Sequence, residues 1–350
     1  MINNSDIEAS LKRITDSRIN GFMDTFSKKI INNEASLFIG AGVSHNSGLP
    51  SWAELLQPCA DDLGIELTSD TNLYDVSQYY VNKHNDNSLR RIVSERVNKL
   101  MPTNTLLNAL MEIGFAGIWT TNFDQLVERV LASNEIAYNA IYNDKSLPGI
   151  DKYDKVNIYK INGDISDAGN MILTRSDYEQ YENKFPLFLT FLKRELVANT
   201  FLFVGYGFND YLILDCLNTI NQMIGSSGNI HYALLPIESY IDTRSEHFID
   251  DLKKRYGIEC LLFKRDELTD VINALNRAVK ERKVFISGAY DSVSEEADKF
   301  ADALSENLVS ELLDHEYRIS TGIGKRLGTY VTVYAHRYLA EKKIKNTSKY

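Results

Sequence analysis

The stretch "WTTNFDQLVE" at residues 119–128 holds polar side chains where a predicted strand ends and a predicted helix begins. Thr121, Asn122 and Asp124 would therefore lie at the carboxyl edge of a sheet, where doubly wound folds bind ligands. Asparagine donates and accepts hydrogen bonds while ionised aspartate only accepts, so the pair can hold the hydroxyl and carboxamide groups of a ligand. The alternative is that Asn122 or Asp124 only caps the next helix.

Glycines follow another predicted strand in "GAGVSHNSGLPSW", residues 40–52. Gly40, Ala41, Gly42 and Ser44 come directly after the apolar segment "ASLFI", and glycines in such a turn let backbone N–H groups approach a pyrophosphate closely. The G-x-G spacing is weak evidence alone, so the prediction depends on the whole context of strand, turn and hydroxyl. A purely structural turn is the alternative.

A third predicted strand, in "FLFVGYGFNDYLI" (201–213), also ends in glycines. Gly205 and Gly207 would lie at the same sheet edge, where a small loop can admit an adenosine. A turn that requires glycine for its positive φ explains them equally well.

In "VNIYKINGDI" (156–165), Asn162 stands where a strand meets a Gly-Asp turn. An enzyme site at this edge would favour a titratable side chain, and asparagine cannot titrate. His45, in the first glycine loop, could supply a base instead, although its sequence context predicts a loop surface.

The elements that would position these residues alternate between strand and helix. Residues 1–34 and most of 71–113 have helical periodicity, and Ser51 with Glu54 fits a capping box. Strands are predicted at 35–42, 116–121, 156–162, 200–206, 231–236 and 259–263. We therefore predict an α/β fold with a doubly wound, mainly parallel sheet and a helical insertion.

A second strand-and-glycine start follows a helical stretch at 266–282. "RKVFISGAY" (282–290) is predicted to be a strand that ends at Gly288, and a strand at "YRIST" precedes "GIGKRLG". The glycines and basic residues that could bind a small phosphorylated ligand are Gly288, Gly322, Gly324, Lys325, Arg326 and Gly328. The alternative is that Lys325 and Arg326 are solvated side chains of a surface loop that binds no ligand. Two clear strands are too few for an independent open sheet, so we expect the chain to be a fragment of a longer protein.

Size and composition limit the class of protein. A chain of 350 residues favours two domains, and a formal charge of −10 makes nucleic acid an unfavourable partner. The apolar runs are shorter than a membrane span, and the first residues lack a secretion signal, so we predict a cytoplasmic protein without membrane contact. Cys59, Cys216 and Cys260 lie too far apart in sequence for a zinc ribbon, and we expect no metal.

Four motifs in order give the chain a resemblance to the sirtuin-like NAD-binding fold over roughly residues 20–280. They are "GAGVS…GLP", "TTNFD", "KINGD" and "GYGFND". Sirtuin deacylases carry a four-cysteine zinc module and an arginine after the Gly-Ile-Pro-x-Phe run, and this sequence has neither. The better match is the ThsA-like family of Thoeris antiphage effectors, which join a sirtuin-like NAD hydrolase to a C-terminal SLOG domain. The segments "KVFISGAY" and "STGIGKRLG" resemble the start of that second domain.

The resemblance implies an NAD glycohydrolase of antiphage defence that releases nicotinamide and ADP-ribose and depletes cellular NAD in abortive infection. It assigns Asn122 to catalysis and Asp124 to the nicotinamide-ribose end of NAD, and it implies a late ribose loop that includes Asp210. It assigns to the diphosphate Gly40, Ala41, Gly42 and Ser44. The family has a histidine at the position of Asn162, so we predict an impaired enzyme, because a general base contributes roughly 10² to 10⁴ in rate. Whether this asparagine is natural or replaces a histidine is left open by the sequence.

The resemblance also implies a sensor. We expect residues 1–281 to form the NAD-hydrolysing domain and 282–350 the beginning of a SLOG domain that binds a cyclic ADP-ribose isomer made by a TIR-domain partner. We expect a homo-oligomer of four or more subunits, and tyrosines such as those in "YDVSQYYVNKH" could form its contacts or an ordinary amphipathic face. The alternative functions are a catalytically silent nucleotide-binding assembly module and a zinc-free NAD-dependent deacylase.

Overall fold

The computed structural model describes residues 4–68, 70–150, 154–225, 228–240, 242–288, 294–322 and 327–343, with side-chain surroundings from residue 18 onward. These residues form two compact units. The first comprises residues up to Asn20 together with Ala35–Ile272, and the second comprises Gly21–Glu34 together with the residues from Asn273 onward.

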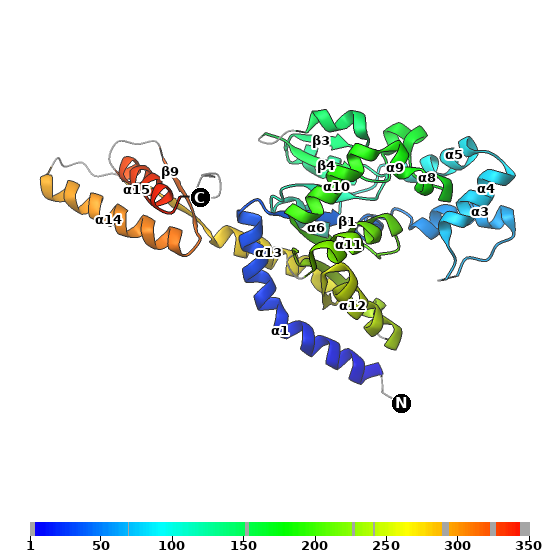
Figure 1. Ribbon diagram of the computed structural model, residues 1–350, viewed down its shortest axis with the longest axis horizontal. Helices are drawn as coiled ribbons and strands as arrows, with labels where there is room; N and C mark the ends of the chain where they lie inside the picture. Colours follow the sequence, from blue (N-terminus) through cyan, green and yellow to red (C-terminus); the bar gives the residue numbers. More distant parts are fainter. Residues whose placement is uncertain are drawn as a thin grey trace. The chain divides into compact units, whose positions relative to one another are not determined.

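A seven-stranded sheet forms the centre of the first unit (Figure 1), in the order β3-β4-β2-β1-β5-β6-β7. The strands are β1 Ala35–Ile39, β2 Ile118–Thr120, β3 Tyr138–Ile141, β4 Val156–Lys160, β5 Thr200–Val204, β6 His231–Pro236 and β7 Ile258–Phe263. Every strand pairing among the described residues of this sheet is parallel. The strand order reverses between β1 and β5, so the carboxyl ends of these strands open a crevice at the topological switch point.

Burial explains why β1 and β5 are such continuous apolar runs. All five residues of each strand are buried, as expected for a parallel sheet covered on both faces. Aromatic side chains fill the layers beside the sheet, and Trp119 stacks on Tyr159 with ring centroids 4.2 Å apart. The α/β prediction and the parallel sheet are confirmed.

The sequence prediction missed β3. Its first three residues are only half-buried, and β3 lies at one edge of the sheet. An edge strand needs no continuous apolar run, so "YNAI" gives little signal.

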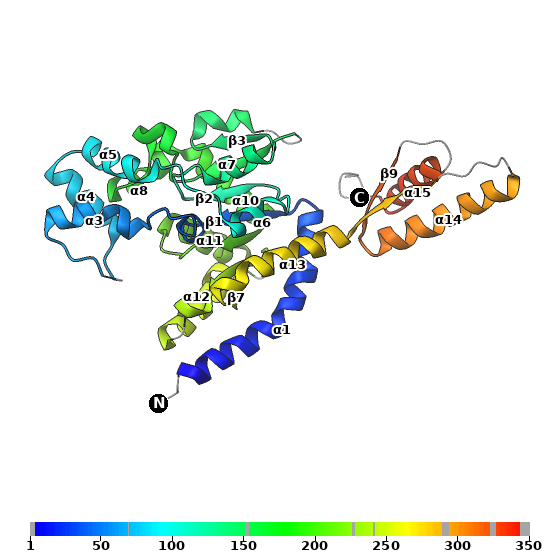
Figure 2. The same ribbon diagram turned by 180° about the vertical axis from the view of Figure 1, so that it is seen from behind.

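The predicted helical insertion is present between β1 and β2, and Figure 2 shows α3, α4 and α5 grouped together beside the sheet. Its helices are α3 Trp52–Leu63, α4 Leu73–Lys83, α5 Asp86–Val97 and α6 Thr105–Met111. The Ser51–Glu54 capping box is confirmed, since the Ser51 N–H donates to Glu54 at 2.6 Å and the Glu54 N–H donates to the Ser51 hydroxyl at 3.3 Å. Side chains of α3, α4 and α5, among them Leu56 and Leu89, pack in one core with Phe123, Met171 and Leu173.

The remaining helices connect the strands or precede them. They are α1 Asn4–Ile31, α2 Ala41–His45, α7 Leu126–Ser133, α8 Arg175–Glu179, α9 Tyr181–Lys184, α10 Pro186–Ala198, α11 Tyr211–Ile224, α12 Thr243–Tyr256 and α13 Leu268–Glu281. Short 3-10 helices span Asp144–Gly149, Ile165–Asn170, Ile237–Ser239 and Arg265–Glu267. None of the described helices is long and apolar enough to cross a membrane.

The second unit contains a parallel pair of strands, β8 Lys283–Ile286 and β9 Arg318–Thr321, with helices α14 Glu295–Asp314 and α15 Leu327–Glu341. The buried residues of the core cluster that these elements share are Ile286, Val309, Leu313, Val331 and Tyr334. The two predicted strands are thus present, and a glycine follows each of them.

Candidate functional site

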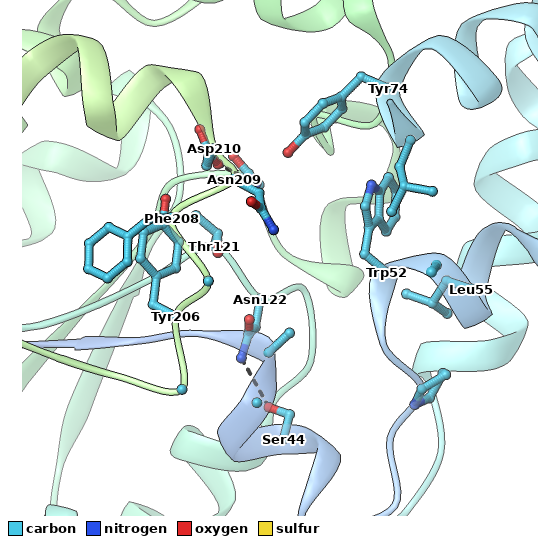
Figure 3. Close-up of a pocket in the computed structure, with 18 of the residues that line it drawn as sticks. Ser44, Trp52, Leu55, Tyr74, Thr121, Asn122, Tyr206, Phe208, Asn209 and Asp210 are labelled. Atoms are coloured by element: carbon cyan, nitrogen blue, oxygen red, sulfur yellow. Dashed lines mark hydrogen bonds between the residues drawn. The ribbon is translucent and has the colours of Figure 1, made fainter. Parts of the chain in front are cut away.

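A cavity of about 780 Å³ opens at the carboxyl edge of the sheet in the first unit (Figure 3). The loops after β1, β2, β4 and β5 contribute to its wall, and the helical insertion supplies the facing side. The residues predicted from sequence that line it are Ala41, Gly42, Ser44, Thr121, Asn122, Asp124, Asn162, Gly205, Gly207 and Asp210. The sheet topology therefore brings together side chains from four separate sequence motifs.

Gly40 does not line the cavity, and its neighbours explain why it is glycine. A Cβ at Gly40 would lie 2.3 Å from the carbonyl oxygen of Gly205, and the Gly42 N–H donates to the same oxygen at 2.9 Å. Gly205 itself has φ +65°, a conformation that favours glycine. These glycines thus allow the loops after β1 and β5 to touch. For Gly40 and Gly205, this contact is a structural reason for glycine that does not require a bound ligand.

The orientation of the Asn122 amide follows from its hydrogen bonds. The Ser44 hydroxyl donates to Asp124 Oδ2 at 2.8 Å, so its oxygen is left to accept from Asn122 Nδ2 at 3.0 Å. The nitrogen of Asn122 is thereby held, and its carbonyl oxygen points away from Ser44 toward the cavity (Figure 3). Asp124 also accepts from the N–H of Leu126, the first residue of α7, at 3.0 Å, so it bonds to the start of that helix as well as lining the cavity.

Asn162 lies in the turn after β4, one residue beyond Ile161, instead of in the strand. Its side chain is only 5% exposed, its Nδ2 lies 3.4 Å from Asp210 Oδ2, and its Oδ1 has no hydrogen-bond partner. An unpaired buried oxygen costs about 1 to 3 kcal/mol, so a ligand that donates to it would recover that energy. The buried hydroxyl of Tyr206 and the indole nitrogen of Trp52, both from cavity-lining residues, also have no partner.

Asp210 is the most heavily bonded carboxylate of the cavity wall. It accepts from the Tyr178 hydroxyl at 2.9 Å and from the Leu212 N–H at 3.0 Å, in addition to the contact with Asn162. Burial raises the pKa of Asp210 above its ordinary value, although these hydrogen bonds oppose the shift.

Lys160 anchors the loop that contains Asn122. Its Nζ, 1% exposed, donates to the carbonyl oxygens of Phe123 at 3.3 Å and Asp124 at 2.5 Å, and it forms ion pairs with Glu128 at 3.0 Å and with Asp164. Burial alone would lower the pKa of Lys160, but the two carboxylates outweigh it and raise that pKa. Lys160 therefore stays charged beneath the loop.

Sequence reasoning missed the wall that faces these loops. Trp52, Leu55 and Tyr74 come from the helical insertion, and Tyr206 and Phe208 stand opposite them (Figure 3). Phe208 has φ +54°, which is unusual for a bulky residue and marks a constrained loop. The sequence could have indicated two of these residues only through their place in the motifs, since Trp52 follows "GLPS" and Phe208 stands inside "GYGFND".

Other predicted residues lie elsewhere. His45 is half exposed and is not among the residues that line the cavity. Gly288, Gly322 and Gly328 belong to the second unit, whereas Gly324, Lys325 and Arg326 lie outside the described residues. Within the described part of the chain, no group of three or more histidine, cysteine or acidic side chains could hold a metal ion.

Two family models match successive parts of the chain. Residues 116–261 match the SIR2-like domain, and residues 267–350 match the Sir2- and TIR-associating SLOG family. Part of the first unit is thus similar to a SIR2-like domain, and the C-terminal region is similar to the SLOG family that associates with Sir2 and TIR domains.

Curated relatives match much of the chain. The protein named NAD(+) hydrolase ThsA from Bacillus cereus (strain MSX-D12) is 27% identical over 324 residues, which cover 89% of this chain and 68% of the relative. ThsA from Enterococcus faecium is 28% identical over 337 residues, covering 87% and 68%. Defense-associated sirtuin 2 from Bacillus subtilis is 25% identical over 64% of this chain and 21% of its own. A solved Sir2 homolog–NAD complex aligns with a TM-score of 0.43 at 14% identity, over 74% of this chain and 94% of that one.

Proposed function

We propose that this chain is an NAD glycohydrolase that converts NAD and water to nicotinamide, ADP-ribose and a proton. The observation that supports the proposal most is the cavity at the switch point, where Asn122 and Asn162 each have a nitrogen bonded within the protein and an oxygen left for a ligand. Relatives that span most of the chain are named NAD(+) hydrolases.

The charges of the cavity suit the reaction. When the bond between nicotinamide and ribose breaks, nicotinamide leaves as a neutral molecule and the ribose becomes cationic. Asp124 and Asp210 line the cavity and place negative charge near that cation. The oxygen of Asn122 can accept a hydrogen bond from the attacking water and direct it at the ribose carbon.

Asn162 limits the rate in this proposal. An imidazole at this position could accept a proton from a ribose hydroxyl or from the water, whereas an amide can only form hydrogen bonds. We expect Asn162→His to raise nicotinamide release by roughly 10² to 10⁴, with Asn162→Gln as the matched control that should not accelerate it. A histidine variant no faster than the parent chain, measured with and without the signal described below, would refute the assignment.

The second unit is proposed to sense a cyclic ADP-ribose isomer produced by a TIR-domain partner. Supporting this proposal are the match to a Sir2- and TIR-associating SLOG family and the close approach of Gly322 and Gly328, where a Cβ at Gly328 would lie 2.4 Å from the Gly322 carbonyl oxygen. Binding there would activate a cytoplasmic homo-oligomer to deplete NAD during infection.

A catalytically silent nucleotide-binding assembly module is the second candidate, and Asn162 is the observation that favours it. The two candidates differ in one measurement. The silent module would bind NAD without releasing nicotinamide even as the Asn162→His variant.

A further inference from the structure

Asp210 connects three elements around the cavity. It precedes α11 and accepts the Leu212 N–H through Oδ1, while its Oδ2 faces the Tyr178 hydroxyl of α8 and the amide of Asn162 after β4. The side chain is only 5% exposed, so these groups are its main partners.

The direction of each hydrogen bond around Asp210 can be worked out. An ionised carboxylate only accepts, so the single hydroxyl proton of Tyr178 goes to Asp210. Tyr74 lies 2.6 Å from Tyr178, oxygen to oxygen, and must therefore donate its own proton to Tyr178. The Tyr74 oxygen is left with lone pairs only. Tyr74 lies beside Trp52 on the cavity wall, and its oxygen points toward the side on which Asp210 lies (Figure 3).

The same reasoning fixes the amide of Asn162. A carboxylate cannot donate to the amide oxygen, so the nitrogen of Asn162 faces Asp210 and the oxygen faces away. That oxygen is buried and has no partner. Asn162 and Tyr74 thus offer only acceptors here, which suits hydroxyl donors and disfavours a phosphate.

We propose that Asp210 is a positioning residue that holds the Asn162 carbonyl oxygen toward the cavity, where it accepts a hydrogen bond from a ribose hydroxyl of NAD. The inference rests on the proposed function, because it takes NAD as the ligand. It assigns Asp210 an effect exerted through residue 162, beyond direct contact with the ligand.

The variant Asp210→Asn tests this arrangement with little change in shape. Asparagine can still cap α11 through its own oxygen. It also introduces an amide nitrogen that can donate, so the amide of residue 162 is free to turn its nitrogen to the cavity. Tyr178→Phe is the matched control, since it removes another partner of Asp210 and leaves the carboxylate to hold Asn162.

The measurement is the affinity of the full chain for NAD and for four NAD analogues, each lacking one ribose hydroxyl, by calorimetry. In the parent chain, one analogue should bind about tenfold more weakly than NAD. The ratio of the two dissociation constants, analogue over NAD, should fall to about twofold or less in Asp210→Asn and stay near tenfold in Tyr178→Phe. A purely structural role would weaken NAD and the analogue equally and leave the ratio unchanged.

Each outcome decides a different question. If the parent chain and its Asn162→His variant both fail to bind NAD, the proposed function fails and this inference with it. If NAD binds but Asp210→Asn keeps the parent ratio, or no hydroxyl deletion weakens binding, only the positioning role of Asp210 is overturned.

Discussion

At the scale of single residues, the cavity depends on amides whose direction is set by acidic neighbours. Asp124 acts on Asn122 through the Ser44 hydroxyl, and Asp210 acts on Asn162 directly. A side-chain amide has a donor end and an acceptor end, so fixing the donor end leaves a defined acceptor for the ligand. The same residue types without these partners could present either end.

Replacing Asn122 should remove catalysis and leave the fold intact. The side chain is only partly buried and its nitrogen donates to the Ser44 hydroxyl, so Asn122→Ala should cost little stability. In an Asn162→His background, we expect nicotinamide release to fall by at least two orders of magnitude while the midpoint of thermal unfolding changes by only a few degrees. Normal turnover in the double variant would show that "TTNFD" serves only to start α7.

His231 should make the stability of the fold depend on pH. Burial lowers the pKa of His231 to about 4, and its Nδ1 accepts the Phe201 N–H at 3.1 Å. Between pH 6.5 and 4 the unfolded chain binds a proton at this histidine and the native chain does not, so this contribution to stability is lost as pH falls through that window. The loss should be about 3 kcal/mol.

Urea unfolding at several pH values tests this prediction, with His231→Phe as the comparison. The difference in unfolding free energy between parent and variant should shrink by that amount from pH 7 to pH 4, and a constant difference would contradict it. Other titrating groups affect both proteins equally.

At the scale of elements, the cavity is formed by the loops that follow the strands, and the buried Lys160 holds the loop after β2 in place. The ammonium bridges Glu128 of α7, Asp164 after β4 and two carbonyl oxygens of the Asn122 loop. A buried charge of this kind is costly unless all partners are present. Lys160 therefore couples the geometry of the loop to the stability of the first unit.

Lys160→Met should destabilise the first unit by about 3 to 5 kcal/mol, because it leaves Glu128 and Asp164 as uncompensated buried acids. Adding Glu128→Leu should restore part of that stability, since it removes one of the two unpaired charges. Urea unfolding of both variants checks the order. If the double variant were less stable than the single one, the ion pairs would not be the source of the loss.

Much of this element level could be predicted from the sequence, and the reasons differ between elements. Buried parallel strands such as β1 and β5 are continuous apolar runs, and Ser51 with Glu54 is a local capping signal, so both were predictable. Edge strand β3 is short and half-buried, and Trp52 and Tyr74 join the cavity only through tertiary packing. The contact between Gly40 and Gly205 likewise joins residues far apart in the sequence, so a local pattern could not distinguish it from a phosphate loop.

At the scale of the whole molecule, the chain combines a unit that holds a cavity of about 780 Å³ and a unit in which Gly322 and Gly328 approach each other closely. In the second unit, β8 and β9 are parallel and α15 begins five residues after Gly322. Gly328 lies in the first turn of α15, close enough to Gly322 that a side chain would not fit without movement.

A signal that binds near Gly322 and Gly328 can activate NAD hydrolysis only if it binds the active arrangement more tightly, because equal affinity for both arrangements shifts nothing. We therefore predict that a cyclic ADP-ribose isomer raises nicotinamide release by the Asn162→His chain, and that changing Lys325 and Arg326 together to alanine weakens its binding at least tenfold. Gly328→Ala should weaken it as well, since its Cβ would displace the Gly322 carbonyl. Calorimetry with the isomer measures both effects, and Gly21→Ala, a glycine inside α1 with no atom near its Cβ, is the control that should bind normally. Equal affinity in the parent and in the Lys325/Arg326 variant would remove this loop from the sensor site.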